Sequence, residues 1–177
     1  RQNIDAWWPA IEAGAEAIIM TASGCGAMVQ DYGHLLKDDP VYAAKAQKVS
    51  ELCTDLGAFL LKQDLEKLKV RQDPGKVAFH CPCTLQHAMK QNGVVEQVLT
   101  RAGVNLAATK DKHLCCGSAG TYSVTQPEMS QKLLGNKLKA LTVDNPDRIV
   151  TANIGCQMHL ETKSPVPVQH WIELLDQ

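Results

Sequence analysis

The sequence lacks an excess of charge of either sign. Eighteen basic residues stand against nineteen acidic ones, so the formal net charge of the 177 residues is −1. A near-neutral chain has no electrostatic footprint for a phosphate backbone, which argues against binding to nucleic acid. A long hydrophobic run is also lacking. The uncharged stretch at 17–30 is interrupted by Thr21, Ser23 and two glycines, so it is too short and too polar to span a bilayer.

An even number of cysteines is lacking as well. The chain has seven, which argues against a fully paired disulfide framework. Cys115 and Cys116 are adjacent, and neighbouring cysteines rarely bridge each other without strain. We therefore expect a reducing compartment, the cytoplasm, where clustered cysteines are more often metal ligands or redox groups than disulfides.

Strands that alternate with helices predict an α/β fold with a mainly parallel sheet. Strands are expected at 17–21, 76–80, 104–109, 148–153 and 166–169. In the first part of the chain, helices are expected at 4–14, from a Gly-rich turn at 23–26 to Leu36, and from Asp39-Pro40 to about Leu68. Further helices are expected at 84–101, at 126–141 and at 155–161. The first of these is expected to break at Asn92-Gly93, and the second to begin after a Thr125–Glu128 capping box. A turn is expected at 73–75.

An internal repeat indicates two related units. Residues 21–25 (TASGC) resemble residues 151–156 (TANIGC), and both follow an expected strand. The interpretation is that residues 1–70 are the back part of one unit and residues 71–177 are a complete second unit. Cys116 precedes Cys156 by 40 residues, whereas only 24 residues precede Cys25. An equivalent cysteine pair would fall upstream of Arg1, so we expect the chain to be a C-terminal fragment.

Cysteines follow three of the expected strands. The carboxyl ends of parallel strands share one edge of a sheet, so Cys83, Cys115, Cys116 and Cys156 can converge there. Thiolates are the soft ligands of iron–sulfur clusters and of zinc, and zinc stays open although the chain has no Cys-x-x-Cys knuckle. Helix N-termini near two of them would lower the thiol pKa values. Glycines that would let the backbone approach a bulky cofactor are Gly117, Gly120 and Gly155.

The remaining candidates keep two interpretations each. Cys53 is expected to be an ordinary buried thiol. Five other residues could each be a metal ligand or have a structural role beside the ligands: Cys81, His159, His80, His87 and Cys25. His159 follows Cys156 by three residues, which puts both on one side of a helix. Cys25 has no obvious partner within the chain.

Three motifs carry a resemblance to a known family. His80-x-x-Cys83-x-x-x-His87, Cys115-Cys116-Gly117-Ser118-Ala119-Gly120-Thr121-Tyr122 and Asn153-x-Gly155-Cys156 resemble the CCG cysteine-rich domain, which occurs twice in heterodisulfide-reductase-type subunits. The resemblance implies Rossmann-like units in tandem, the first truncated here. It implies an iron–sulfur centre, [4Fe–4S] in type, on Cys83, Cys115, Cys116 and Cys156. Two ferredoxin-type motifs are implied upstream.

The chain departs from the family pattern at two positions. His159 stands where the heterodisulfide-reductase motif ends in cysteine, and Cys81 is extra. With one thiolate fewer, a single cluster that carries electrons is expected instead of a disulfide-cleaving centre.

Within the family, residues 3–9 and 21–29 resemble the iron–sulfur subunits of bacterial glycolate oxidases. The resemblance implies an electron-transfer subunit without catalytic residues of its own. It would receive electrons from FAD on a flavoprotein partner and pass them to a membrane quinone or another acceptor, in the cytoplasm or peripherally on the inner face of the membrane. Alternatives are a glycerol-3-phosphate or lactate dehydrogenase complex, a zinc-bound or metal-free docking scaffold, and a thiol–disulfide reductase that uses Cys115 and Cys116.

Overall fold

The computed structural model describes residues 1–65 and 74–175. Its strands form two sheets in these ranges, and every pairing is parallel. The small sheet pairs β1 (Ile18–Met20) with β2 (Cys53–Asp55), and the larger sheet has the order β4-β3-β5-β6. Its strands are β3 (Lys76–His80), β4 (Asn105–Leu106), β5 (Arg148–Thr151) and β6 (Val168–His170). The predicted α/β class with a mainly parallel sheet is confirmed.

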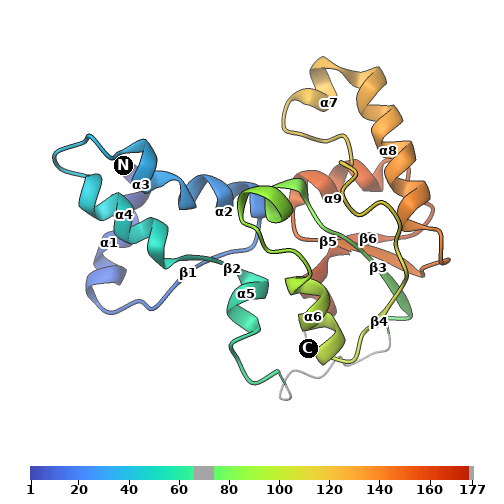
Figure 1. Ribbon diagram of the computed structural model, residues 1–177, viewed down its shortest axis with the longest axis horizontal. Coiled ribbons are helices and arrows are strands. Elements are labelled where there is room, and N and C mark those ends of the chain that lie inside the picture. Colours follow the sequence, from blue (N-terminus) through green and yellow to red (C-terminus); the bar gives the residue numbers. More distant parts are fainter. Residues whose placement is uncertain (66–73, 176–177) are drawn as a thin grey trace.

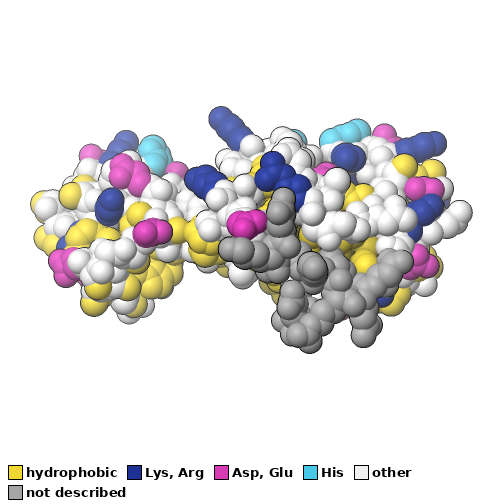
Figure 2. Space-filling view, turned by 90° about the horizontal axis from the view of Figure 1, so that it is seen from below, with side chains coloured by type: hydrophobic (Ala, Val, Ile, Leu, Met, Phe, Trp, Pro, Cys, Tyr) yellow, Lys and Arg dark blue, Asp and Glu magenta, His cyan; other side chains and the backbone are white. Residues whose placement is uncertain are grey.

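Helices surround both sheets (Figure 1). Around the small sheet they are α1 (Gln2–Glu12), α2 (Ser23–Gln30), α3 (Tyr32–Leu35), α4 (Ala43–Leu52) and α5 (Leu56–Leu60). Around the larger sheet they are η2 (Thr84–Ala88), α6 (Val94–Arg101), α7 (Tyr122–Thr125), α8 (Pro127–Leu141), α9 (Ile154–Glu161) and η3 (Trp171–Leu174). None of the described helices combines the length and apolar character that a membrane crossing needs. On the face drawn in Figure 2, basic and acidic side chains are interspersed over both parts.

Strand alternation divides the larger sheet into two buried faces. Val77 and Phe79 of β3 pack into a core with residues of α6 and η3, whereas Ala78 packs on the opposite face against α8 and α9. Side chains on a strand alternate between faces with a period of two. Helices cover both faces (Figure 1), so the strands are almost continuously apolar. By the same alternation, His80 shares the face of Ala78.

The first sixty residues gather around the small sheet. A separate core forms where α1, α2 and α4 cover β1 and β2, and its buried members are Ile4, Val29, Ala46, Val49 and Cys53. The expected burial of the Cys53 thiol is therefore confirmed. Strand β2 has no counterpart in the sequence prediction.

The expected long helix from Asp39 to Leu68 is wrong. The chain leaves α4 at Leu52 and forms β2, whose Cys53 pairs with Ile18 of β1. Asp55 then caps α5 by accepting a hydrogen bond from the Gly57 N–H at 2.8 Å. Short apolar runs do not distinguish strand from helix by periodicity, and pairing with β1 decided this one. The end of that expected helix, part of the 73–75 turn and the expected unit boundary lie outside the described residues.

Other local predictions had mixed outcomes. Residues 23–26 form the first turn of α2 and not a separate loop. The Thr125–Glu128 capping box is absent, since the Thr125 hydroxyl donates to the Thr121 carbonyl at 3.2 Å. The helix break at Asn92-Gly93 is confirmed, with Gly93 at φ 75° directly before α6. The strand expected at 104–109 shortens to β4.

Polar contacts join the two parts of the chain. The Ser23 N–H donates to the Ala152 carbonyl at 3.1 Å, and the Ser23 hydroxyl lies 2.7 Å from that of Thr84. The Asn153 amide nitrogen also donates to the Ser23 hydroxyl at 3.2 Å. Ser23 and Asn153 stand at the same place in the two copies of the repeat. Both lie between a strand and a helix, Ser23 as the first residue of α2 and Asn153 as the N-cap of α9. The repeated segments therefore lie directly against each other.

A close backbone approach holds the loop that contains Cys115 and Cys116. Gly117 has φ 94°, and an added Cβ would collide with the Ser130 carbonyl oxygen of α8. The buried Ser130 hydroxyl donates to the Gly117 carbonyl at 2.8 Å. The loop thus depends on glycine at this position. Gly120, by contrast, has φ 62° with open space around it.

We predict that Gly117→Ala destabilises the chain far more than Gly120→Ala. Both substitutions force alanine into the left-handed region, which costs about 1 kcal/mol. Gly117→Ala adds a collision with fixed backbone, for a total loss of about 3 kcal/mol. Urea unfolding followed by far-UV circular dichroism measures the two free energies. Equal losses would show that the contact with Ser130 does not constrain the loop.

Candidate metal centre

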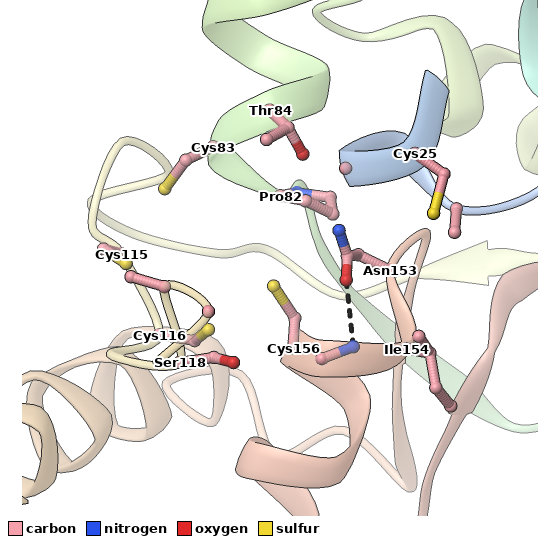
Figure 3. A pocket seen from close by; sticks show the side chains of 15 residues that line it. Cys25, Pro82, Cys83, Thr84, Cys115, Cys116, Ser118, Asn153, Ile154 and Cys156 are labelled. Carbon is pink, nitrogen blue, oxygen red and sulfur yellow. Dashed lines mark hydrogen bonds between the residues drawn. The ribbon is translucent and has the colours of Figure 1, made fainter. Parts of the chain in front are cut away.

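Four cysteines from three strand ends surround one cavity. Cys83 follows β3, Cys115 and Cys116 lie in the loop between β4 and α7, and Cys156 lies in the first turn of α9. Figure 3 shows their side chains around a common space. The cavity measures about 520 Å³ and is otherwise lined by uncharged side chains. The structure thus brings together the four residues that the sequence singled out as ligands.

The four thiols shift one another's pKa values. Interaction with Cys116 and Cys83 lowers the pKa of the Cys115 thiol to about 2, and the Gly117 N–H donates to the same sulfur at 3.3 Å. Interaction with Cys116 and with the adjacent His80 lowers the pKa of the Cys156 thiol to about 5. The pKa values of Cys83 and Cys116 are raised by the neighbouring sulfurs and by burial. The cluster therefore favours thiolates at Cys115 and Cys156.

A buried lysine lies beside these thiols. Lys137 of α8 is 1% exposed, and its ammonium donates to the backbone carbonyls of Asp111 and Lys112 at 3.4 and 3.1 Å. Burial lowers its pKa, whereas the negative charge of the cysteine cluster, Cys115 included, acts in the opposite direction. An ammonium in a protein interior needs a compensating negative charge. Among the described residues, no carboxylate forms an ion pair with Lys137, and the thiolates supply that charge.

His80 lies behind the cysteines, at the end of β3. Its side chain is fully buried, and neither ring nitrogen has a hydrogen-bond partner among the described residues. One ring nitrogen and the sulfurs of Cys116 and Cys156 all lie within 4.8 Å of one another. His80 is therefore in reach of the centre, although it does not line the cavity.

Three other candidates lie away from the cavity. Cys81 packs into the core on the α6 face, and burial raises its pKa to about 12. His87 is exposed on η2. His159 contacts the Ser130 hydroxyl at 3.1 Å through Nε2, and Ser130 in turn holds Gly117. His159 thus supports the cysteine loop from behind.

Cys25 lies in the first turn of α2 and lines the same cavity from the other part of the chain. Figure 3 shows it across Pro82 and Asn153 from the other four cysteines. Its thiol is exposed. Cys53, by contrast, is buried in β2 with its thiol donating to the Gly26 carbonyl at 3.7 Å, and burial raises its pKa to about 11.

Two supporting residues, Ser130 and Lys137, and the capping role of Asn153 were not predicted from the sequence. Asn153 caps α9 by accepting a hydrogen bond from the Gly155 N–H at 2.9 Å (Figure 3). An Asn two residues before Gly at a strand end is a recognisable capping signal. Ser130 and Lys137 carry no such signal, because a serine and a lysine within a helix are ordinarily solvent-exposed. Only their burial under the cysteine loop distinguishes them.

Comparison with known proteins agrees with this geometry. Residues 77–161 match the CCG family, described as a cysteine-rich domain. The glycolate oxidase iron-sulfur subunit of Escherichia coli strain K12 is 59% identical over 177 residues, which are 100% of this chain and 43% of that protein. The probable glycolate oxidase iron-sulfur subunit of Bacillus subtilis strain 168 is 32% identical over 163 residues, 91% of this chain and 36% of that protein. Lactate utilization protein A of Geobacillus thermodenitrificans is 24% identical over 170 residues, 93% of this chain and 71% of that protein.

The chain therefore spans less than half the length of the two glycolate oxidase relatives. The family resemblance carried by the cysteine motifs is confirmed. Residues 77–161 are a CCG cysteine-rich domain.

Proposed function

We propose that the chain is part of the electron-transfer subunit of a glycolate oxidase complex, and that it holds an iron–sulfur centre on Cys83, Cys115, Cys116 and Cys156. The observation that carries the proposal is the meeting of four thiols from three strand ends at one cavity. The 59% identity to a glycolate oxidase iron-sulfur subunit supports the choice of complex. Such a centre would accept and release single electrons.

The donor set fits this group. Four thiols correspond to the Cys₄ ligation of [4Fe–4S] clusters, which we propose as the type. Cys115 and Cys156 already favour the thiolate form, and Lys137 supplies a buried positive charge against the negative charge of a thiolate centre. The cavity of about 520 Å³ is larger than a single zinc ion bound to four sulfurs needs. Its size thus favours a cluster over zinc.

Oxidation of glycolate itself is assigned to another subunit. None of the described residues that line the cavity is Asp, Glu, Lys or Arg. A small carboxylate substrate would find no cationic partner there, and no acid–base pair is in place for hydride or proton removal. We therefore propose that FAD and the substrate lie on a flavoprotein partner. The chain would pass electrons onward to a quinone or another acceptor at the inner face of the cytoplasmic membrane.

Lactate is the second candidate substrate class for the complex. Several lactate utilization proteins match more than nine-tenths of the chain, at 24–29% identity. The higher identity to the glycolate oxidase subunit favours glycolate. We also propose that residues 1–70 and 71–177 are parts of two tandem units. The equivalent strand–helix junctions at β1–α2 and β5–α9 support this division.

We predict that Cys116→Ser removes an iron–sulfur signal that Cys53→Ser leaves unchanged. Both thiols are buried, but only Cys116 faces the cavity. The intact protein, purified without oxygen, is assayed for iron and acid-labile sulfide and by electron paramagnetic resonance after dithionite reduction. Wild-type protein without iron, or with stoichiometric zinc, would contradict the proposal. Disulfide reduction that needs Cys116 but no iron would point to a thiol–disulfide reductase.

We predict that Lys137→Met lowers iron content and shifts the midpoint potential of the same signal to more negative values. Reduction adds negative charge, and the buried ammonium that offsets this charge is gone. Lys139→Met is the matched control, because Lys139 is an exposed residue on the same helix. Potentiometric titration followed by paramagnetic resonance measures the shift. An equal shift in both variants would exclude a specific role for Lys137.

A further inference from the structure

His80 and Thr151 end two neighbouring strands in register. Parallel pairing of β3 with β5 puts His80 opposite Thr151. Strand alternation places both side chains on the face of Ala78 and Ile149, which α8 and α9 cover. The buried or half-buried cysteines on that face are Cys116 and Cys156. His80 therefore lies on the side of the sheet where the proposed centre is held.

The imidazole is buried without a conventional partner. His80 is 0% exposed, and neither of its ring nitrogens makes a hydrogen bond with the described residues. The hydroxyl oxygen of Thr151, its neighbour across the strands, is equally unpartnered, so the two side chains do not satisfy each other. Buried polar groups are almost always hydrogen-bonded, and each exception calls for a specific explanation. The ring nitrogen needs an acceptor that the oxygen and nitrogen atoms around it do not supply.

Sulfur is the acceptor within reach. The sulfurs of Cys116 and Cys156 and one ring nitrogen of His80 lie within 4.8 Å of one another. Of the two cysteines, Cys156 lies in α9, directly after β5, the strand whose end is paired in register with His80. The Cys156 sulfur is therefore the better acceptor for a ring N–H.

Direct ligation by His80 fits the structure less well. Four thiols from the cavity wall already complete a Cys₄ set, and His80 is absent from that wall. A ring behind Cys156 can reach the ligand without reaching a metal held in the cavity. The geometry suits a residue that orients a ligand from outside the coordination shell.

We propose that His80 is a positioning residue, which donates a ring N–H hydrogen bond to the Cys156 sulfur and thereby raises the reduction potential of the centre. This inference rests on the proposed function, since it needs an iron–sulfur centre on Cys156. A hydrogen bond to a ligand sulfur draws negative charge away from the cluster, which makes addition of an electron easier. Loss of the donor therefore shifts the potential to more negative values.

Three variants of the intact protein test the proposal. His80→Leu removes the donor with an apolar side chain, and His80→Gln restores an N–H donor. His87→Leu is the matched control, because His87 is an exposed histidine on the adjacent η2. The signal that Cys116→Ser abolishes identifies the centre. Potentiometric titration of that signal, and electron–nuclear double resonance in H₂O and D₂O, provide readouts that are independent of glycolate oxidation.

The expected result is a more negative potential in His80→Leu, a smaller shift in His80→Gln and none in His87→Leu. An exchangeable proton coupled to the centre is expected in the wild type and in His80→Gln, and is lost in His80→Leu. An unchanged potential in His80→Leu, or a strong ¹⁴N coupling typical of a directly bound imidazole, overturns the inference. If the centre does not assemble in His80→Leu, two results still test the inference: the exchangeable-proton coupling in the wild type and the shift in potential in His80→Gln. Wild-type protein without any iron–sulfur signal would instead overturn the proposed function.

Discussion

The parallel pairing of β3 with β5 is the constraint on which the candidate centre depends. Its register runs from Val77 opposite Arg148 to His80 opposite Thr151, so both strands end at the same level. Cys83 and Cys156 follow these two ends and are brought together although far apart in the sequence. The loop with Cys115 and Cys116 is then fixed from the other side, where Gly117 lies against Ser130 of α8. One strand register and one helix contact thus define the positions of four sulfurs.

Charge balance is the second organising principle of the site. A group of thiolates in a partly buried cavity is unfavourable unless positive charge or hydrogen-bond donors lie close by. One such donor is the Gly117 N–H, which lies 3.3 Å from the Cys115 sulfur. The positive charge comes from Lys137, whose buried ammonium donates hydrogen bonds to two backbone carbonyls instead of to water. Each of these groups is costly to bury alone, and each is compensated by the same set of sulfurs.

The sequence predicted those features that rest on strand ends and on local chemistry. Apolar runs bounded by Gly and Pro placed β3 and β5, and the shared edge of a parallel sheet then placed the cysteines. Prediction failed where a short segment had two locally acceptable structures. Residues 53–55 continue a helical pattern, and only pairing with β1 makes them a strand. Lys137 and Ser130 were missed because their burial depends on a loop that packs over α8 from elsewhere in the chain. His159 supports that loop through Ser130, a contact that spacing from Cys156 does not reveal.

The junction between the two parts of the chain has a consequence for access to the sulfurs. Ala22, Gly24 and Cys25 form part of the cavity wall, although they belong to the small-sheet part. Ser23 holds this segment in place through Ala152, Thr84 and Asn153. A shorter polypeptide that began at β3 would keep the four clustered cysteines but would lose this side of the wall. Its sulfurs would then face dissolved oxygen directly, so the small-sheet part acts as a shield for the proposed centre on its neighbour.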